Sequence, residues 1–351
     1  MDERSLKIDY HQLREFISRE FGLFFETGKF SFLENRILPL FSKINSFDLN
    51  DFIKTVQADQ SFKNELLAVL TTNETWFFRH PKHFEILREV IFPSIRDFDK
   101  RPSKEIYIWS AGCSIGAEAY SIAIVAREMM TSHPNVNVKI IGSDISPYAI
   151  SKAKEGIYSS TEIRLVPQRL LAAFFIPSSP GFFKVKPELS QMVSFELRNL
   201  LDSKWIDISF DIIFCRNTMI YFNEETKKHL TERFFNGLKN GGIFIPGSTE
   251  TLHWGENRQF IREFAMGEYF YRKCVQSFEN FQYFFSTPHD LLKAISLLVE
   301  ENIEFTITPI DIANPASKRS LYVPKGMEEK AEQIFSKANI EPVLRKKSQL
   351  R

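Results

Sequence analysis

The sequence predicts an α/β protein built on a doubly wound, mostly parallel sheet, with a helical domain before it and a small α+β domain after it. Strand-length apolar segments alternate with helix-length segments through the middle of the chain, which is typical of a parallel sheet. Apolar residues near the N-terminus keep helical spacing alone, and short alternating segments return near the C-terminus. A length of 351 residues leaves room for two or three domains.

Residues 1–72 are predicted to form the helical domain. Leu13, Phe16 and Ile17 recur at the three- and four-residue intervals of a helix face. Apolar residues between 52 and 70 repeat this pattern after a polar break. We therefore expect several short helices and no strand in this region.

Residues 73–275 are expected to supply the parallel sheet. The predicted strands are 106–109, 138–142, 211–214 and 240–245, and the predicted helices are 117–130, a segment starting at 147, and 224–238. Parallel strands joined by helices favour a doubly wound arrangement. Between residues 156 and 195 this rhythm is broken by prolines and short apolar runs, which predicts an inserted β-subdomain.

Residues 276–351 are predicted to form a separate small domain with the order βαββα. The predicted elements are strand 281–285, helix 289–300, strands 304–308 and 320–323, and helix 327–337. This domain is a candidate for binding another protein. Residues 344–351 are basic, and we expect them to be a frayed, solvated tail.

The composition excludes several classes of protein. A net charge of +1 gives no overall attraction to nucleic acid, so no nucleic-acid partner is expected. No apolar run approaches the ~18 residues of a membrane span, so direct membrane insertion is not expected. Cys113, Cys215 and Cys274 are too widely spaced for a zinc or redox motif, and we expect no metal. The sequence therefore predicts a soluble protein of the reducing cytoplasm.

The segment 210–222 delivers polar side chains to the end of an apolar strand. Its strand residues are followed by Arg216 and Asn217 and then by a second apolar run that contains Tyr221. Ligands of open α/β sheets bind just beyond the carboxyl ends of the strands, so this segment is a candidate site. A core strand followed by a polar turn is the simpler alternative.

The glycine turn at residues 109–116 is a second candidate. Gly112 and Gly116 would allow a ligand to approach the backbone, but the pattern is not the Gly-x-Gly-x-x-Gly of a pyrophosphate cradle. Glu118 lies in the first turn of the helix after this turn, and Asp144, at the end of the next strand, is placed to accept hydrogen bonds from a ribose diol. The simpler alternative for Glu118 is a surface carboxylate that stabilises the helix dipole. The simpler alternative for Asp144 is a helix cap. A nucleoside pocket without a phosphate cradle favours S-adenosylmethionine over a dinucleotide.

The segment 70–79 combines hydroxyl, amide, aromatic and guanidinium groups just before the sheet begins. Arg79 is a candidate for bidentate binding of a carboxylate. Trp76 to Phe78 would form an apolar wall near a sulfonium. A helix start capped by Thr72 or Asn73 is the structural alternative.

Segments 71–79, 109–121, 143–145 and 210–222 are similar, in order and spacing, to the successive motifs of the chemotaxis receptor glutamate O-methyltransferases of the CheR type. The resemblance covers residues 10–275. It implies a Rossmann-like, S-adenosylmethionine-dependent methyltransferase domain, a helical N-terminal domain and an inserted β-subdomain. It also implies methylation of glutamate side chains in the cytoplasmic region of methyl-accepting chemotaxis receptors, a reaction of sensory adaptation in signal transduction.

The resemblance, together with the glycine turn, implies these cofactor-binding residues: Asn73, Thr75, Arg79, Gly112, Glu118, Asp144, Asn199, Leu200, Arg216 and Asn217. Glu118 would hold the amino-acid part of the cofactor, Asp144 its ribose, and the pair Asn199 and Leu200 its adenine. Arg79 and, more weakly, Tyr221 are the candidate catalytic residues that orient the acceptor carboxylate. Residues 116–121 read Gly-Ala-Glu-Ala-Tyr-Ser where the family has Gly-Glu-Glu-Pro-Tyr-Ser, so we expect cofactor affinity to differ.

Two other functions are compatible with such a cofactor pocket. A methyltransferase of small molecules would share the pocket and differ at the acceptor side. A non-catalytic scaffold that senses S-adenosylmethionine would retain binding without turnover, because of the altered turn at residues 116–120. The helical domain and the inserted subdomain favour a protein acceptor, since a small acceptor needs no docking surface.

Overall fold

The computed structural model describes residues 9–25, 30–71, 74–94, 105–202, 208–248, 250, 260–273, 279–285, 288–301, 306–307, 320–324, 327–340, 342 and 344–349. The chain divides into two compact units, Met1–Gly255 with Gln259–Cys274, and Glu256–Arg258 with Val275–Arg351.

The first unit begins with a helical domain, as predicted. Its helices are α1 (Tyr10–Phe21), α2 (Phe30–Lys43), α3 (Leu49–Ala58) and α4 (Gln60–Leu70). The carboxylates of Asp9, Asp48 and Asp59 cap α1, α3 and α4, each accepting two backbone N–H bonds. Gly22 ends α1 with a φ of 74°, a conformation in which a side chain would be strained.

A seven-stranded sheet follows, with the order β6-β2-β1-β7-β8-β10-β9. The strands are β1 (Glu105–Ala111), β2 (Asn137–Asp144), β6 (Val193–Leu197), β7 (Phe210–Cys215), β8 (Leu238–Pro246), β9 (Phe260–Ala265) and β10 (Glu268–Lys273). The first five are parallel to one another, and the hairpin β9–β10 adds an antiparallel edge. The predicted doubly wound, mostly parallel sheet is therefore confirmed.

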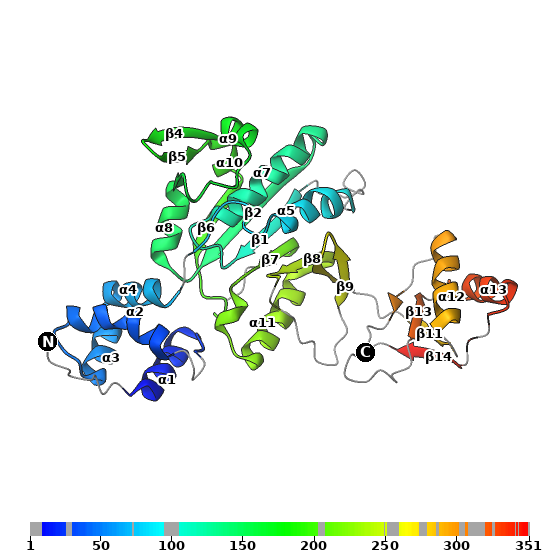
Figure 1. Cartoon of the computed structure of the whole chain (residues 1–351), viewed down its shortest axis with the longest axis horizontal. Coiled ribbons are helices and arrows are strands. Elements are labelled where there is room, and N and C mark those ends of the chain that lie inside the picture. Colours follow the sequence, from blue (N-terminus) through cyan, green and yellow to red (C-terminus); the bar gives the residue numbers. More distant parts are fainter. Residues whose placement is uncertain are drawn as a thin grey trace. The chain divides into compact units, whose positions relative to one another are not determined.

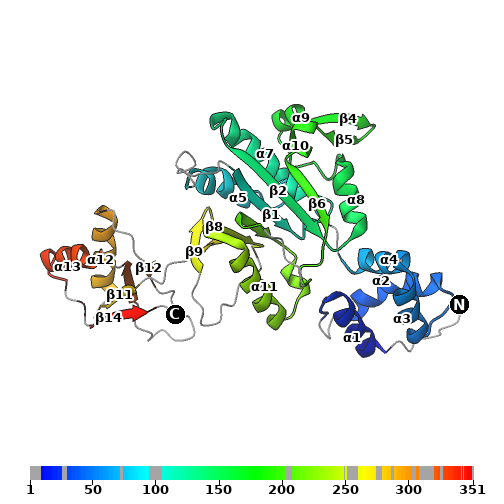
Figure 2. The same ribbon diagram turned by 180° about the vertical axis from the view of Figure 1, so that it is seen from behind.

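Helices cover both faces of this sheet (Figures 1 and 2). They include α5 (Pro81–Ile86), α7 (Ala117–Ser132), α8 (Pro147–Glu155) and α11 (Glu224–Gly237). Ile108 and Ile212 point to the core that contains residues of α5, α7 and α8. Trp109 and Ile213 point the other way, to a core that they share with Phe234 of α11 and with the N-terminal helices. The alternation of strand side chains thus joins the helical domain to one face of the sheet.

The segment 156–195 contains an inserted β-subdomain, as predicted. Its elements are β3 (Ile157–Ser159), α9 (Gln168–Phe174), β4 (Phe175–Ser179), β5 (Phe182–Val185) and α10 (Pro187–Ser190). The three strands form an antiparallel sheet of order β3-β5-β4. The chain then returns to the main sheet through β6, a strand that the sequence did not predict.

The second unit contains β11 (Glu279–Phe284), α12 (Pro288–Glu300), β12 (Thr306–Ile307), β13 (Ser320–Pro324), α13 (Glu328–Lys337) and β14 (Leu344–Gln349). Its sheet order, β12-β13-β11-β14, is that of a ferredoxin-like βαββαβ unit. The prediction of a frayed tail is wrong for residues 344–349, because β14 pairs with β11 along its whole length. Lysine and arginine are common on edge strands, where they discourage aggregation, so the basic composition was misleading.

No helix among the described residues could span a membrane.

Candidate active site

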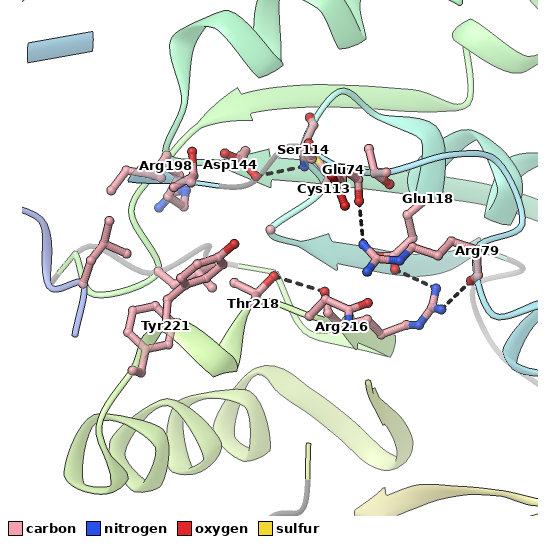
Figure 3. A pocket seen from close by; sticks show the side chains of 18 of the residues that line it. Glu74, Arg79, Cys113, Ser114, Glu118, Asp144, Arg198, Arg216, Thr218 and Tyr221 are labelled. Atoms are coloured by element: carbon pink, nitrogen blue, oxygen red, sulfur yellow. Dashed lines mark hydrogen bonds and ion pairs between the residues drawn. The ribbon is translucent and has the colours of Figure 1, made fainter. Parts of the chain in front are cut away.

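A pocket lies in the first unit where the carboxyl ends of β1, β2 and β7 meet the end of α1 and the segment before α5 (Figure 3). Every predicted site residue that the structure describes lines it: Thr75, Arg79, Gly112, Glu118, Asp144, Asn199, Leu200, Arg216, Asn217 and Tyr221. Asn73 lies outside the described residues. The structure therefore brings the predicted residues together, and their individual roles remain predictions.

A buried ion pair forms one wall of the pocket. Arg216, with 3% of its side chain exposed, donates from Nη1 to Glu118 Oε2 at 3.0 Å. The other Glu118 oxygen accepts a bond of 2.7 Å from Ser110 Oγ. Burial lowers the pKa of Arg216, and the charge of Glu118 opposes that shift. Glu118 is thus not the surface carboxylate of the simpler alternative, because its side chain is 12% exposed.

Arg216 also connects this pair to the segment that carries Arg79. Its Nη2 donates to the backbone carbonyl of Arg79 at 2.5 Å. Its Nε is buried and has no hydrogen-bond partner among the residues that the structure describes. An unpaired, buried guanidinium N–H is costly.

Asp144 ends β2 and faces the same pocket. Its Oδ2 accepts the backbone N–H of Ser114 at 2.8 Å, and its Oδ1 accepts that of Ser146 at 2.9 Å. Burial raises the pKa of Asp144, while these backbone bonds oppose the shift. The hydroxyl of Ser146 caps α8 by accepting the N–H of Ala149. Asp144 therefore holds the glycine turn against β2 and is not the side-chain cap of α8.

Gly112 is required by a contact between two turns. Its φ is 80°, and a Cβ at this position would lie 2.2 Å from Thr218 Oγ1, in the turn after β7. The N–H groups of Gly112 and Cys113 both donate to the carbonyl of Ser143, at 2.8 and 2.9 Å. The close approach that this glycine permits is thus between the turns after β1 and β7.

Gly112→Ala should lower the free energy of unfolding by about 2 to 5 kcal/mol. A left-handed alanine costs about 1–2 kcal/mol, and overlap with Thr218 adds about 1–3 kcal/mol. The double variant G112A/T218A removes the overlap and should recover part of the loss in denaturant unfolding, with T218A alone as the control. Equal stabilities of G112A and the double variant would show that the overlap with Thr218 is not the cause.

The segment before α5 holds Arg79 in a constrained backbone. Phe78 and His80, on either side of it, have φ values of 56°, which are strained for residues other than glycine. The N–H of Phe78 donates to Ser121 Oγ of α7 at 2.9 Å. The Arg79 side chain donates from Nη1 to the carbonyl of Glu74 at 2.6 Å. Its guanidinium thus lines the pocket without a carboxylate partner among the described residues.

Glu250, after β8, organises the turn after β7, and sequence reasoning missed it. Its carboxylate is buried and accepts the backbone N–H groups of Asn217 at 2.9 Å, Ile220 at 3.2 Å and Gly247 at 2.8 Å. Burial raises the pKa of Glu250, and the backbone bonds oppose the shift. Asn217 has a φ of 56°, so the turn is strained and needs such support. The sequence signal that could have identified Glu250 is an acidic residue just beyond a strand, at the carboxyl edge of the sheet.

The N-terminal domain supplies part of the pocket wall, which sequence reasoning also missed. Phe21 and Leu23, at the end of α1, line the pocket. The N–H of Phe24 donates to the carbonyl of Tyr221 at 2.7 Å, and Asn199 Nδ2 donates to the carbonyl of Phe21 at 3.2 Å. Trp76 lines the pocket, as expected of the apolar wall, whereas Phe77 and Phe78 belong to the core. The remaining lining residues outside the predicted set are Thr71, Glu74, Phe84, Cys113, Ser114, Ile145, Arg198, Thr218 and Phe222.

The donor and acceptor set of the pocket fits S-adenosylmethionine. Glu118 and Asp144 offer carboxylate oxygens for an ammonium group and a ribose diol, and Arg216 adds positive charge to the pocket wall for a carboxylate. Figure 3 shows Asp144 and Arg198 at one end of the pocket and Glu118, Arg79 and Arg216 at the other. In the described part of the chain, no cluster of His, Cys, Asp and Glu could hold a metal ion.

Comparison with known proteins agrees with this chemistry. Residues 8–71 match the model described as CheR methyltransferase, all-alpha domain, and residues 73–267 match CheR methyltransferase, SAM binding domain. The chemotaxis protein methyltransferase of Borreliella burgdorferi is 35% identical over 73% of this chain and 92% of that protein. Chemotaxis protein methyltransferase Cher2 of Pseudomonas putida is 32% identical, over 70% and 91%. The corresponding Escherichia coli protein is 32% identical, over 75% and 91%. The cofactor of the site is S-adenosylmethionine, and the chain belongs to the CheR methyltransferase family.

Proposed function

We propose that the protein is a cytoplasmic protein-glutamate O-methyltransferase that converts glutamate side chains of chemotaxis receptors into methyl esters. The proposal rests on one observation: the guanidinium of Arg79 lines the cofactor pocket and has no carboxylate partner among the described residues. Such a group suits a carboxylate acceptor. The names of the relatives, chemotaxis protein methyltransferases, support receptors as the substrate.

The acceptor brings its own negative charge to this reaction. A glutamate side chain has a pKa of about 4.3 and is ionised at neutral pH, so the protein needs no general base. When bound, S-adenosylmethionine supplies an electrophilic methyl group on a sulfonium. The task of the protein is to align the carboxylate oxygen with that methyl group and to exclude water. Arg79 would orient the carboxylate, and Trp76 and Phe84 give the pocket apolar walls.

Tyr221 is the second residue that would touch the acceptor. Figure 3 shows it on the opposite side of the pocket from Arg79. Its carbonyl accepts a hydrogen bond from the N–H of Phe24, so the segment after α1 helps to fix its backbone. We therefore place the reacting carboxylate between Arg79 and Tyr221.

The structure also bears on the two alternative functions. Phe21 and Leu23 make the N-terminal domain part of the wall, which suits a protein acceptor better than a small molecule. The altered turn at 116–120 retains the Glu118–Arg216 pair at 3.0 Å, which fits cofactor binding in an enzyme and in a sensing scaffold alike, so the transfer assay decides between these two functions.

Two measurements test the proposed function. Calorimetry with S-adenosylmethionine should show binding, and receptor-rich membranes incubated with tritiated methyl donor should gain base-labile label on receptor glutamates. Receptors whose acceptor glutamates are replaced by alanine serve as the control. Cofactor binding without base-labile transfer would contradict an enzymatic role, and transfer to a small molecule alone would contradict the protein acceptor.

The C-terminal domain is proposed to bind another protein rather than to serve catalysis. It has its own core, which includes Tyr283, Leu298 and Phe335, so it does not depend on the first unit for its packing. Deleting residues 276–351 should leave the affinity for S-adenosylmethionine unchanged in calorimetry and remove a protein partner in cross-linking. A large loss of cofactor affinity would instead tie this domain to the active site.

A further inference from the structure

The segment that carries Arg79, residues 75–79, is fixed to the inserted subdomain; we call it the arginine arm. The N–H of Phe77 donates to the carbonyl of Glu162 at 2.9 Å. The Phe77 ring also packs edge-on against Tyr158 and Phe175, with ring centroids 4.8 and 5.2 Å apart. Tyr158 and Phe175 belong to β3 and β4. The inserted subdomain therefore forms part of the support of the arginine arm.

A second contact links the same two regions through Trp76. The guanidinium carbon of Arg164, in the turn between β3 and α9, lies 4.0 Å from the centroid of the Trp76 ring. The guanidinium carbon of Arg79 lies 5.1 Å from the same centroid. Both distances are within the range of cation–π attraction. One indole ring thus contacts the proposed carboxylate-binding arginine and a cation of the inserted subdomain.

The Arg164 side chain is held for this contact. Its Nη1 donates to the carbonyl of Thr161 at 2.8 Å, within the same turn. It forms no ion pair with a carboxylate of the described chain, and it does not line the pocket. The residue is exposed, so it does not contribute to a core. Its interaction with Trp76 is therefore the contact through which it can act on the site.

We propose that Arg164 is a positioning residue for methyl transfer. By holding the Trp76 ring, it sets the surface against which the Arg79 guanidinium lies, and the inserted subdomain thereby controls the orientation of the acceptor-binding group. The role of Arg79 in this inference rests on the proposed function. The mechanical link between Arg164, Trp76 and the arginine arm does not.

The kinetic test compares three variants of the full chain. Arg164→Ala should lower kcat two- to fivefold, the factor that one cation–π contact at an exposed site provides. The affinity for S-adenosylmethionine should change less than kcat, and the melting temperature should fall by no more than a few degrees. Arg164→Lys keeps a cation and should recover part of kcat. Arg169→Ala, which removes another exposed arginine of the subdomain, paired with Glu128, is the matched control and should behave as wild type.

A double-mutant cycle shows whether Arg164 acts through Trp76. In a Trp76→Ala background, Arg164→Ala should cause no further loss of kcat. Additive losses, or a wild-type kcat in the Arg164→Ala variant, would overturn the proposal.

Hydrogen exchange gives a readout that needs no acceptor. The peptide covering residues 74–80 contains the protected N–H groups of Phe77 and Phe78. It should exchange faster in the Arg164→Ala variant than in Arg169→Ala. If it does so while wild type transfers no methyl group to receptors, the proposed function fails and the positioning link stands. Unchanged exchange in Arg164→Ala contradicts the link.

Discussion

Arg79→Ala should remove most methyl transfer, lowering kcat by about 10²–10³-fold, the usual effect of losing one pre-oriented donor in an active site. The fold should survive, because among the residues described the guanidinium forms one hydrogen bond, to the carbonyl of Glu74, and one cation–π contact, with the Trp76 ring. Its removal therefore leaves no buried carboxylate unpaired. The expected result is measured as kcat on receptor-rich membranes, together with the melting temperature and the affinity for S-adenosylmethionine.

Arg79→Lys is the matched control for this prediction. Lysine retains the charge but not the planar fork that binds a carboxylate through two hydrogen bonds. The kcat of Arg79→Lys should therefore lie between that of Arg79→Ala and that of the wild type. Arg216→Ala would be a poor substitute, since it leaves Glu118 without its partner in a buried pair. Near-normal turnover in Arg79→Ala would remove Arg79 from its proposed role.

The fold could be predicted where the apolar residues of an element follow one clear period, that of a strand or that of a helix. The strands at β1, β2, β7 and β8 and the helix at α7 were found from apolar segments and the glycine turns between them. The hairpin β9–β10 was missed because its burial pattern is mixed, with Phe264 and Tyr269 exposed. β14 was assigned to a solvated tail because its residues are basic, and only its pairing with β11 reveals a strand.

The site could be predicted where its residues end strands or begin helices. Asp144, Arg216 and Glu118 stand at such positions, and parallel topology brings those positions to one edge of the sheet. Phe21 and Leu23 could not be found in this way, because they reach the pocket only through packing of the N-terminal domain. The simpler reading of Asp144 as a helix cap was excluded only by the hydroxyl of Ser146, which caps α8.

Glu250→Ala should lower both stability and cofactor affinity. The substitution leaves the buried N–H groups of Asn217, Ile220 and Gly247 without their acceptor. Each N–H group left without an acceptor costs about 1–3 kcal/mol of stability. The substitution also removes the cost of burying the Glu250 carboxylate, whose pKa is raised by burial, and this offsets part of the loss. We expect the free energy of unfolding to fall by about 3 kcal/mol. Because Asn217 lines the pocket in a left-handed conformation, the affinity for S-adenosylmethionine should fall as well.

Two comparisons make this result specific to the turn after β7. Glu250→Gln keeps one carbonyl oxygen but places an amide N–H₂ against backbone donors, so its stability and affinity should lie between alanine and wild type. Glu232→Ala, at an exposed position of α11, should match wild type in both. Denaturant unfolding and calorimetry measure the two quantities separately. If Glu250→Ala kept wild-type affinity while losing stability, Glu250 would support the fold without shaping the cofactor pocket.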